Sequence, residues 1–247
     1  MNNSVTNTAR LLGAGLRALL VLTVVCGVLY PLAVTGVAQG LFPDKANGSE
    51  IRANGTVVGS SLIGQSYNLP LKKGQETPVP DLKWFQGRPA NGLVVNSVNT
   101  QYTLILSGAT NRAGDNAELI KWVKDAKAAV VKDNSVNGYT VKPSEVPADA
   151  VTSSGSGLDP DISPAYADIQ VHRIAEKNDL PVAQVQKLVD EHTDGRTLGF
   201  IGEPRVNVLE LNIALKAHSW RRADGLARTT RELADEDHPR ARRLPQP

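Results

Sequence analysis

A long run without any charged side chain, from Ala18 to Phe42, constrains this chain more than any other feature of its sequence. The run spans about 25 residues, or about 37 Å as an α-helix, and the hydrocarbon core of a bilayer is about 30 Å thick. It therefore predicts a transmembrane helix, which we expect over residues 16–42. A cleaved secretory signal is the alternative, because Gly36-Val37-Ala38 offers small residues to a peptidase. The length favours an uncleaved anchor, since the apolar part of a signal is only about 7 to 15 residues.

The flanks of this run predict its orientation. Arg10 and Arg17 precede it without an acidic neighbour, whereas Asp44, Lys45 and Glu50 roughly cancel beyond it. Positive charge marks the cytoplasmic side of a membrane helix. We expect a single-pass protein of the cell (inner or plasma) membrane, with residues 1–15 in the cytoplasm and residues 43–216 in an extracytoplasmic domain.

Composition narrows the chemistry of that domain. Cys26, the one cysteine, lies inside the apolar run, so the domain has no disulfide and no cysteine metal site. The net charge of +2, without a Lys/Arg stripe, gives no reason to expect a nucleic-acid partner. The histidines lack metal-ligand spacing and no Gly-x-Ser-x-Gly motif is present, so we expect no metal, no catalytic residue and no enzyme acting by itself.

Local patterns predict an α+β domain with an N-terminal hairpin, extended segments and C-terminal helices. Asn54-Gly55 is a strong hairpin signal within residues 51–63, because both turn positions accept positive φ. The Pro- and Gly-rich residues 68–92 predict an extended loop that Trp84 and Phe85 anchor on the core. Apolar residues at helical spacing predict three helices, over residues 117–131, 165–177 and 181–192.

The last ordered segment, residues 206–216, carries two competing signals. Its leucines and isoleucine alternate as in a strand, but Asn207 and Glu210 form an N-cap and N3 pair, which favours a helix. We predict a helix. From residue 217 to residue 247, charges and prolines crowd together without periodicity, and we expect a disordered tail.

The stretch "SSGSGLDPDISP", residues 153–164, could be a ligand loop. Gly155-Ser156-Gly157 lies between an extended segment and a helix, where backbone N–H groups can hold an anion. However, the third glycine of a dinucleotide fingerprint is missing, and Asp159 and Asp161 would repel a phosphate. A calcium loop fails as well, because its turn glycine is replaced by Pro164 and its final glutamate by Gln170.

The remaining interpretation of this stretch is structural. Ser163 would cap a helix whose first residue is Pro164, with Asp161 near the positive end of the helix dipole. The expected apolar stripe of that helix is Ala165, Ile169 and Ile174.

Taken in order, five motifs resemble one known family. They are "YPLAVTGVAQ", "GSSLIGQ", "WFQGRPA", "SSGSGLDPDISPAYADIQVHRIA" and "GEPRVNVLELNIAL". The chain resembles the C subunit of the Kdp potassium-transporting ATPase, a bacterial high-affinity potassium pump. The resemblance implies an accessory, non-catalytic subunit that assembles with a potassium-binding membrane subunit and a P-type ATPase subunit.

The resemblance also implies a link to ATP. The family is described as a catalytic chaperone that raises the ATP affinity of the ATPase subunit, and Gln170 matches a glutamine proposed to contact nucleotide. ATP is therefore a possible ligand, although none is expected to bind tightly. The predicted orientation instead places Gln170 outside, where cytosolic ATP is absent, and favours a role at the outer mouth of the potassium-conducting subunit.

The matched motifs supply the other candidate site residues. These candidates for motif and interface roles are Gly87, Arg88, Pro89, Ser154, Gly155, Ser156, Gly157, Asp159, Asp161, Ser163, Arg173, Asn207, Glu210 and Asn212. The alternative function is a membrane-anchored extracytoplasmic module that binds a small anion at residues 155–163.

Overall fold

The computed structural model describes residues 2–75, 78–89, 93–95, 103–105, 107–108 and 111–218. The chain divides into two compact units, Met1–Glu50 and Ile51–Pro247. The expected disordered tail lies, from residue 219 on, outside the described residues. So does Ala90 of the "WFQGRPA" motif.

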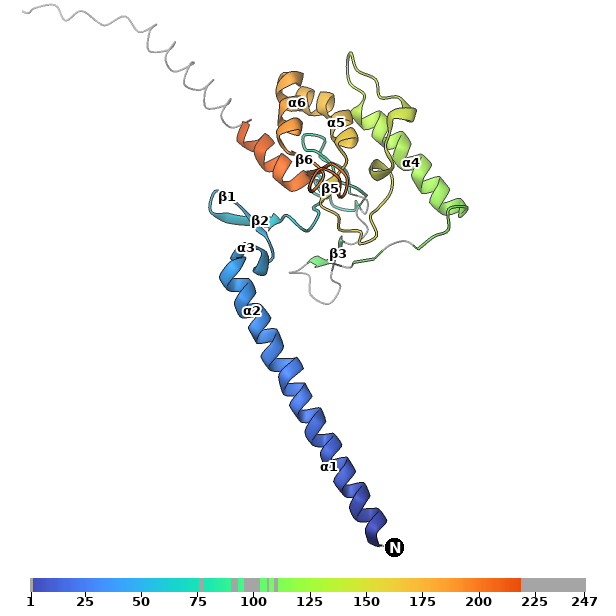
Figure 1. Cartoon of the computed structure of the whole chain (residues 1–247). Coiled ribbons are helices and arrows are strands. Elements are labelled where there is room, and N and C mark those ends of the chain that lie inside the picture. The colour runs from blue at the N-terminus through green and yellow to red at the C-terminus, as the bar shows by residue number, and fades with distance from the viewer. Residues whose placement is uncertain are drawn as a thin grey trace, which may run out of the picture. The chain divides into compact units, whose positions relative to one another are not determined.

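The first unit is one long helical rod followed by a short helix. It consists of α1 (Asn2–Val24), a π-helical turn η1 (Val25–Leu29), α2 (Tyr30–Leu41) and α3 (Pro43–Ala46) (Figure 1). Pro31 has no N–H to continue the hydrogen-bond ladder, and the wider π turn lies directly before it. The segment Ser4–Leu41, 38 residues long, is the one helix of the described chain that is long and apolar enough to cross a membrane.

The second unit begins with the predicted hairpin. Strands β1 (Glu50–Ala53) and β2 (Thr56–Ser60) pair with each other across a two-residue turn. Asn54 and Gly55 have φ angles of 51° and 79°, so both adopt the left-handed conformation that this turn requires. The hairpin prediction is confirmed.

The predicted helices are also confirmed. They are α4 (Ala117–Asn134), α5 (Pro164–Lys177), α6 (Val182–Glu191) and the helix of residues 208–218. Two short 3-10 turns, η2 (Pro143–Glu145) and η3 (Ala148–Ala150), lie between α4 and α5. The Asn116 side chain caps α4 by accepting from the Leu119 N–H at 3.0 Å.

Short strands connect these helices into one body. Strands β5 (Asp161–Ile162), β7 (Arg205–Asn207) and β6 (Thr193–Asp194) form an antiparallel sheet in the order β5-β7-β6. A separate pair joins β3 (Leu93–Val95) and β4 (Thr103–Ile105). Asn207 ends β7 and caps the next helix, since its Oδ1 accepts from the Glu210 N–H at 3.2 Å. The predicted helix is confirmed, whereas the alternating leucines and isoleucine that suggested a strand lie within the helix, and the strand β7 ends before them.

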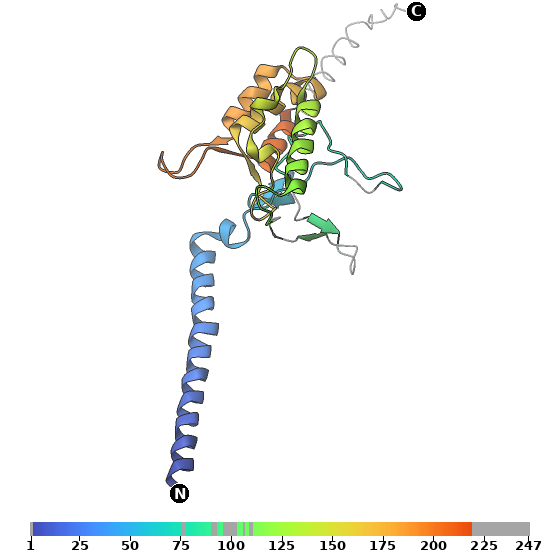
Figure 2. The same ribbon diagram turned by 90° about the vertical axis from the view of Figure 1, so that its right-hand side faces the viewer.

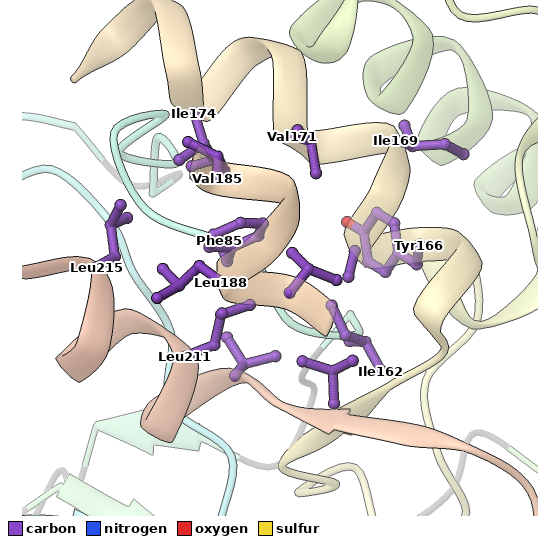
Figure 3. Packing of buried hydrophobic residues seen from close by; sticks show 14 of the residues in the cluster. Phe85, Ile162, Tyr166, Ile169, Val171, Ile174, Val185, Leu188, Leu211 and Leu215 are labelled. Atoms are coloured by element: carbon purple, nitrogen blue, oxygen red, sulfur yellow. The ribbon is translucent and has the colours of Figure 1, made fainter. Parts of the chain in front are cut away.

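The core lies among α5, α6, the sheet and the helix of residues 208–218. Figure 3 shows Ile174, Leu188 and Leu211 gathered around Phe85, which comes from the extended segment before Gln86. Phe85, Ile174 and Leu211 are fully buried. The predicted stripe of α5 is wrong at Ala165, which is exposed, because the first turn of the helix buries Tyr166 and Ala167 instead.

Candidate functional site

The segment of residues 82–88, which contains most of the motif "WFQGRP", begins with a turn at residues 82–84 and then continues without regular secondary structure. Its backbone is bound by side chains instead of a neighbouring strand. Asn212 holds its centre: the Nδ2 group donates to the Phe85 carbonyl at 3.0 Å, and Oδ1 accepts from the Phe85 N–H at 2.9 Å. Asn212 is 2% exposed. This amide therefore completes the hydrogen bonds of a backbone unit that is buried without a sheet.

Gln170 binds the next residue of the segment in the same way. Its Oε1 accepts from the Gln86 N–H at 2.7 Å and from Arg173 Nη2 at 2.6 Å, while Nε2 donates to the Gln86 carbonyl at 3.0 Å. The side chain is fully buried. The structure thus places the candidate nucleotide-contact residue inside the domain, with both ends of its amide bound to the chain itself.

Arg173 closes the arrangement. Its guanidinium donates to the carbonyl oxygens of Leu82 and Trp84, to Asn134 Oδ1 at 2.8 Å and to Gln170 Oε1. Burial lowers the pKa of Arg173 to about 10, so the group stays charged at neutral pH. Its hydrogen-bond acceptors are neutral oxygens rather than a carboxylate, and together with the two amides they fix the path of residues 82–86.

This fixed path carries Arg88 to the "SSGSGLDPDISP" loop. Arg88 Nη1 forms an ion pair with Asp159 Oδ2 at 3.1 Å, and its other nitrogens donate to the carbonyls of Thr152 at 3.4 Å and Ser153 at 3.3 Å. Asp159 also uses Oδ1 to accept from the Asp161 N–H at 3.0 Å. Two motifs that lie about seventy residues apart along the chain therefore meet at one arginine.

Asp161 connects this pair to the third motif. Its Oδ2 contacts Arg205 Nε at 3.2 Å, and its Oδ1 accepts from Asn207 Nδ2 at 3.2 Å. Burial raises the pKa of Asp161, and nearby Asp159 adds to that rise, while Arg205 opposes it. Arg205 belongs to "GEPRVN" and was not among the predicted site residues, because only the folded chain brings it beside Asp161.

Ser163 has the predicted capping role. Its Oγ accepts from the Tyr166 N–H at 3.1 Å, and Pro164 is the first residue of α5. Asp149 in turn accepts from the Ser163 N–H at 2.7 Å and from its hydroxyl at 3.0 Å. Asp149 lies in the 3-10 turn η3, and no spacing in the sequence predicts its contact with Ser163.

The serine and glycine loop binds itself. Ser154 Oγ accepts from the Gly157 N–H at 3.0 Å, and Ser156 Oγ accepts from the Leu158 N–H at 3.1 Å. Gly157 has a φ of 69°, a left-handed conformation that glycine adopts without a steric penalty. These two N–H groups, which an anion would need, are already occupied by hydroxyls, and this weighs against the small-anion module.

Between these motifs lies a groove of about 530 Å³, lined by Arg88, Arg205 and the carboxylates of Asp149, Asp159, Asp161 and Glu203. Gly87 and Pro89, together with Arg88, line a second cavity of about 200 Å³. Within the part of the chain that the structure describes, no group of three His, Cys, Asp or Glu residues could hold a metal ion. The groove offers paired charges of both signs, a surface suited to recognising polar groups of a partner.

The predicted site residues thus fall into two sets. Gln170, Arg173 and Asn212 are buried and hold the segment of residues 82–88. Most of the others line the groove or shape its loop, whereas Gly87 and Pro89 line the second cavity and Glu210 is exposed at the helix start. Asn134, Asp149 and Arg205 complete these sets but carry no signal in the sequence beyond residue type.

Fold and site together define a class of protein: a small α+β domain joined to one helix that could cross a membrane. The family model described as "KdpC: K+-transporting ATPase, c chain" matches residues 12–217. The chain is 88% identical over 216 residues to a "Potassium-transporting ATPase KdpC subunit" of Streptomyces avermitilis, covering 87% of this chain and 97% of that protein. A protein of the same description from Streptomyces coelicolor is 78% identical, covering 87% of this chain and 96% of that protein. Another from Gemmatimonas aurantiaca is 43% identical, covering 83% of this chain and 93% of that protein. The chain belongs to the KdpC family of K⁺-transporting ATPase c chains.

Proposed function

We propose that this chain is the accessory c subunit of an ATP-driven potassium import pump, and that it works beside a potassium-binding membrane subunit and a P-type ATPase subunit. Membership of the c-chain family over residues 12–217 is the observation that carries this proposal. The apolar helix Ser4–Leu41 supports a subunit held in the same membrane as its partners.

The proposed arrangement keeps the domain limits that the sequence suggests. Residues 1–15 lie in the cytoplasm, residues 16–42 cross the membrane and residues 43–216 form the outer domain. Arg10 and Arg17 support this orientation, because basic residues flank the cytoplasmic end of membrane helices. Under this orientation the groove of Arg88, Asp159, Asp161 and Arg205 faces the outer side, where potassium enters the pump.

The role of the outer domain is then to stabilise the complex or to shape potassium entry. Its groove presents rigid ion pairs, since the segment that carries Arg88 is held by Asn212, Gln170 and Arg173. The finer role described for the family, a rise in ATP affinity through Gln170, would require that side chain to release the backbone of Gln86. We propose that Gln170 acts as a positioning residue.

The test removes the chain from cells that carry the rest of the pump. Potassium uptake and recovery of the assembled complex should both fall, and undiminished uptake with an intact complex would contradict the proposal. Complementation with Arg88→Ala, with thermal unfolding of that variant measured in parallel, separates fold from interface. If the groove contacts a partner, assembly should fall by more than any loss of thermal stability explains.

A separate experiment tests whether Gln170 contacts ATP. A photoreactive ATP analogue added to the purified complex should label the ATPase subunit. Labelling of this chain within residues 164–177 would instead support the nucleotide contact at Gln170.

A further inference from the structure

The hairpin between β6 and β7 carries the most exposed large apolar side chains of the described second unit. Figure 2 shows this orange hairpin extending away from the helices. At its end, residues 197–202, which we name the apolar tip, expose Leu198 by 79%, Phe200 by 73% and Ile201 by 51%. Exposing three such side chains together costs free energy in water, and such clusters mark interaction surfaces.

Hydrogen bonds give the tip a defined conformation. Thr197 and Ile201 exchange both of their backbone hydrogen bonds at 2.9 Å. Inside them, the Gly199 N–H donates to the Arg196 carbonyl at 3.0 Å, and the Phe200 N–H donates to the Thr197 carbonyl at 3.3 Å. The tip therefore presents its side chains on a closed turn, and four of its N–H groups, those of Thr197, Gly199, Phe200 and Ile201, can leave water without losing partners.

The backbone of the tip is held in an unfavourable conformation for its sequence. Leu198 has a φ of 55°, and a branched apolar residue rarely adopts this left-handed region. Gly199 and Gly202 have φ angles of 82° and 81°. Strain of this kind often marks a functional site, and here it coincides with the exposure of Leu198 and Phe200.

The charges around the tip favour a protein partner over a lipid surface. Arg196 and Glu203 flank the tip and pair with each other at 2.8 Å, and one step further Arg205 contacts Asp194 at 3.4 Å. Segments that enter a bilayer surface are typically rich in Trp, Tyr, Lys and Arg. The tip contains none of these, and the two ion pairs at its base leave no net positive charge that would attract anionic headgroups.

We propose that the apolar tip inserts into an uncharged apolar groove on another protein subunit of the pump. This inference rests on the proposed function. A standard protein interface buries about 800 Å² of surface on each partner, and three side chains cannot supply that area. The tip acts as a local anchor, because the membrane helix already keeps the partners together and raises their effective concentration.

Photo-crosslinking tests the identity of the partner. The full chain, with p-benzoylphenylalanine replacing Phe200, is co-expressed with the other pump subunits and irradiated in the membrane. The expected product is a protein adduct to one of those subunits. Adducts to lipid alone, or no adduct, would overturn the proposal. The same replacement at Trp122, an aromatic residue 41% exposed on α4, is the matched control.

Substitution tests the strength of the anchor. Phe200→Ser and Leu198→Ser should each reduce recovery of this chain with the detergent-purified pump by at least about tenfold. The unfolding temperature should not change, because these side chains are mostly exposed. Val182→Ser, at 40% exposure, should have no effect on recovery. Equal recovery of the Phe200→Ser chain overturns the tip proposal, whereas failure of the unmodified chain to co-purify at all overturns the proposed function.

Discussion

Arg173 is the largest fully buried side chain among the described residues, and its charge is held by carbonyl and amide oxygens. Arg173→Lys keeps the charge but not the planar set of donors that reaches Leu82, Trp84, Asn134 and Gln170 together. We expect it to lower the free energy of unfolding by at least about 3 kcal/mol, because several buried acceptors lose their donors.

Denaturant unfolding of the full chain in detergent measures this effect. Arg196→Lys is the matched control, because Arg196 is 46% exposed and makes one surface ion pair. Its effect should stay within about 0.5 kcal/mol. Equal stability of the two variants would show that the guanidinium geometry at Arg173 is unimportant.

Asp161 should make stability depend on pH in the direction opposite to a typical paired carboxylate. Burial raises its pKa above the ordinary 3.8, so across that interval the folded state holds the proton more tightly than the unfolded state. The contribution of Asp161 to stability therefore falls as the pH rises from the ordinary value through the raised one. Asp161→Asn lacks this loss and should gain stability relative to the unmodified chain over the same interval.

Thermal unfolding of both proteins at a series of pH values gives this difference directly. Removing the opposing charge with Arg205→Gln should extend the upper end of the interval to higher pH, because Arg205 lowers the pKa of Asp161 in the folded state. A difference between Asp161→Asn and the unmodified chain that does not vary with pH would contradict the assignment.

The burial of single residues in α5 was only partly predictable from the sequence. Helical periodicity predicts Ile169 and Ile174 as buried, and they are. It assigns polar residues to the surface, so it cannot predict that Gln170 and Arg173 are buried. Their burial depends on backbone carbonyl oxygens of residues 82–86, about ninety residues earlier, and no local sequence pattern predicts those hydrogen bonds.

At the scale of elements, Gly64 marks the contact between "GSSLIGQ" and the serine and glycine loop. Its N–H donates to the Leu158 carbonyl at 2.8 Å, and a Cβ added there would lie 2.6 Å from the Asp159 carbonyl oxygen. Because both sides of this contact are backbone, Gly64→Ala should lower the free energy of unfolding by about 1 to 3 kcal/mol.

Unfolding of the full chain again measures the effect. Gly155→Ala is the control, because nothing lies within 4 Å of its added Cβ. A neutral Gly64→Ala would mean that the two segments are not packed as closely as the structure places them.

Elements with local signals were predictable, and those with distant partners were not. The Asn54-Gly55 turn and the Ser163-Pro164 cap each depend on neighbouring residues, and both elements form as predicted. In the β5-β7-β6 sheet, β5 pairs with a strand that is far away along the chain, and each strand has only two or three residues, which is too short for an alternating pattern. The same non-locality kept Arg205 out of the predicted site.

At the scale of the whole molecule, the open question is which side of the membrane holds the second unit. The positive flank of Arg10 and Arg17 argues for an outer location, and the ATP role described for the family argues for the cytoplasmic side. The proposals for the groove and for the apolar tip both depend on the answer, because each side offers different surfaces of the partner subunits.

Because the chain has a single cysteine, single-cysteine labelling can decide which side of the membrane holds the second unit. In a Cys26→Ala background, Lys187→Cys places one thiol at a side chain that is 75% exposed on α6, and Ser4→Cys places one near the N-terminus. A membrane-impermeant maleimide should label the cysteine at position 187 in intact cells and the one at position 4 only after permeabilisation. The reverse pattern would place the groove in the cytoplasm and would reopen the nucleotide role of Gln170. A mature chain that lacks residues 1–38 would instead support a cleaved signal.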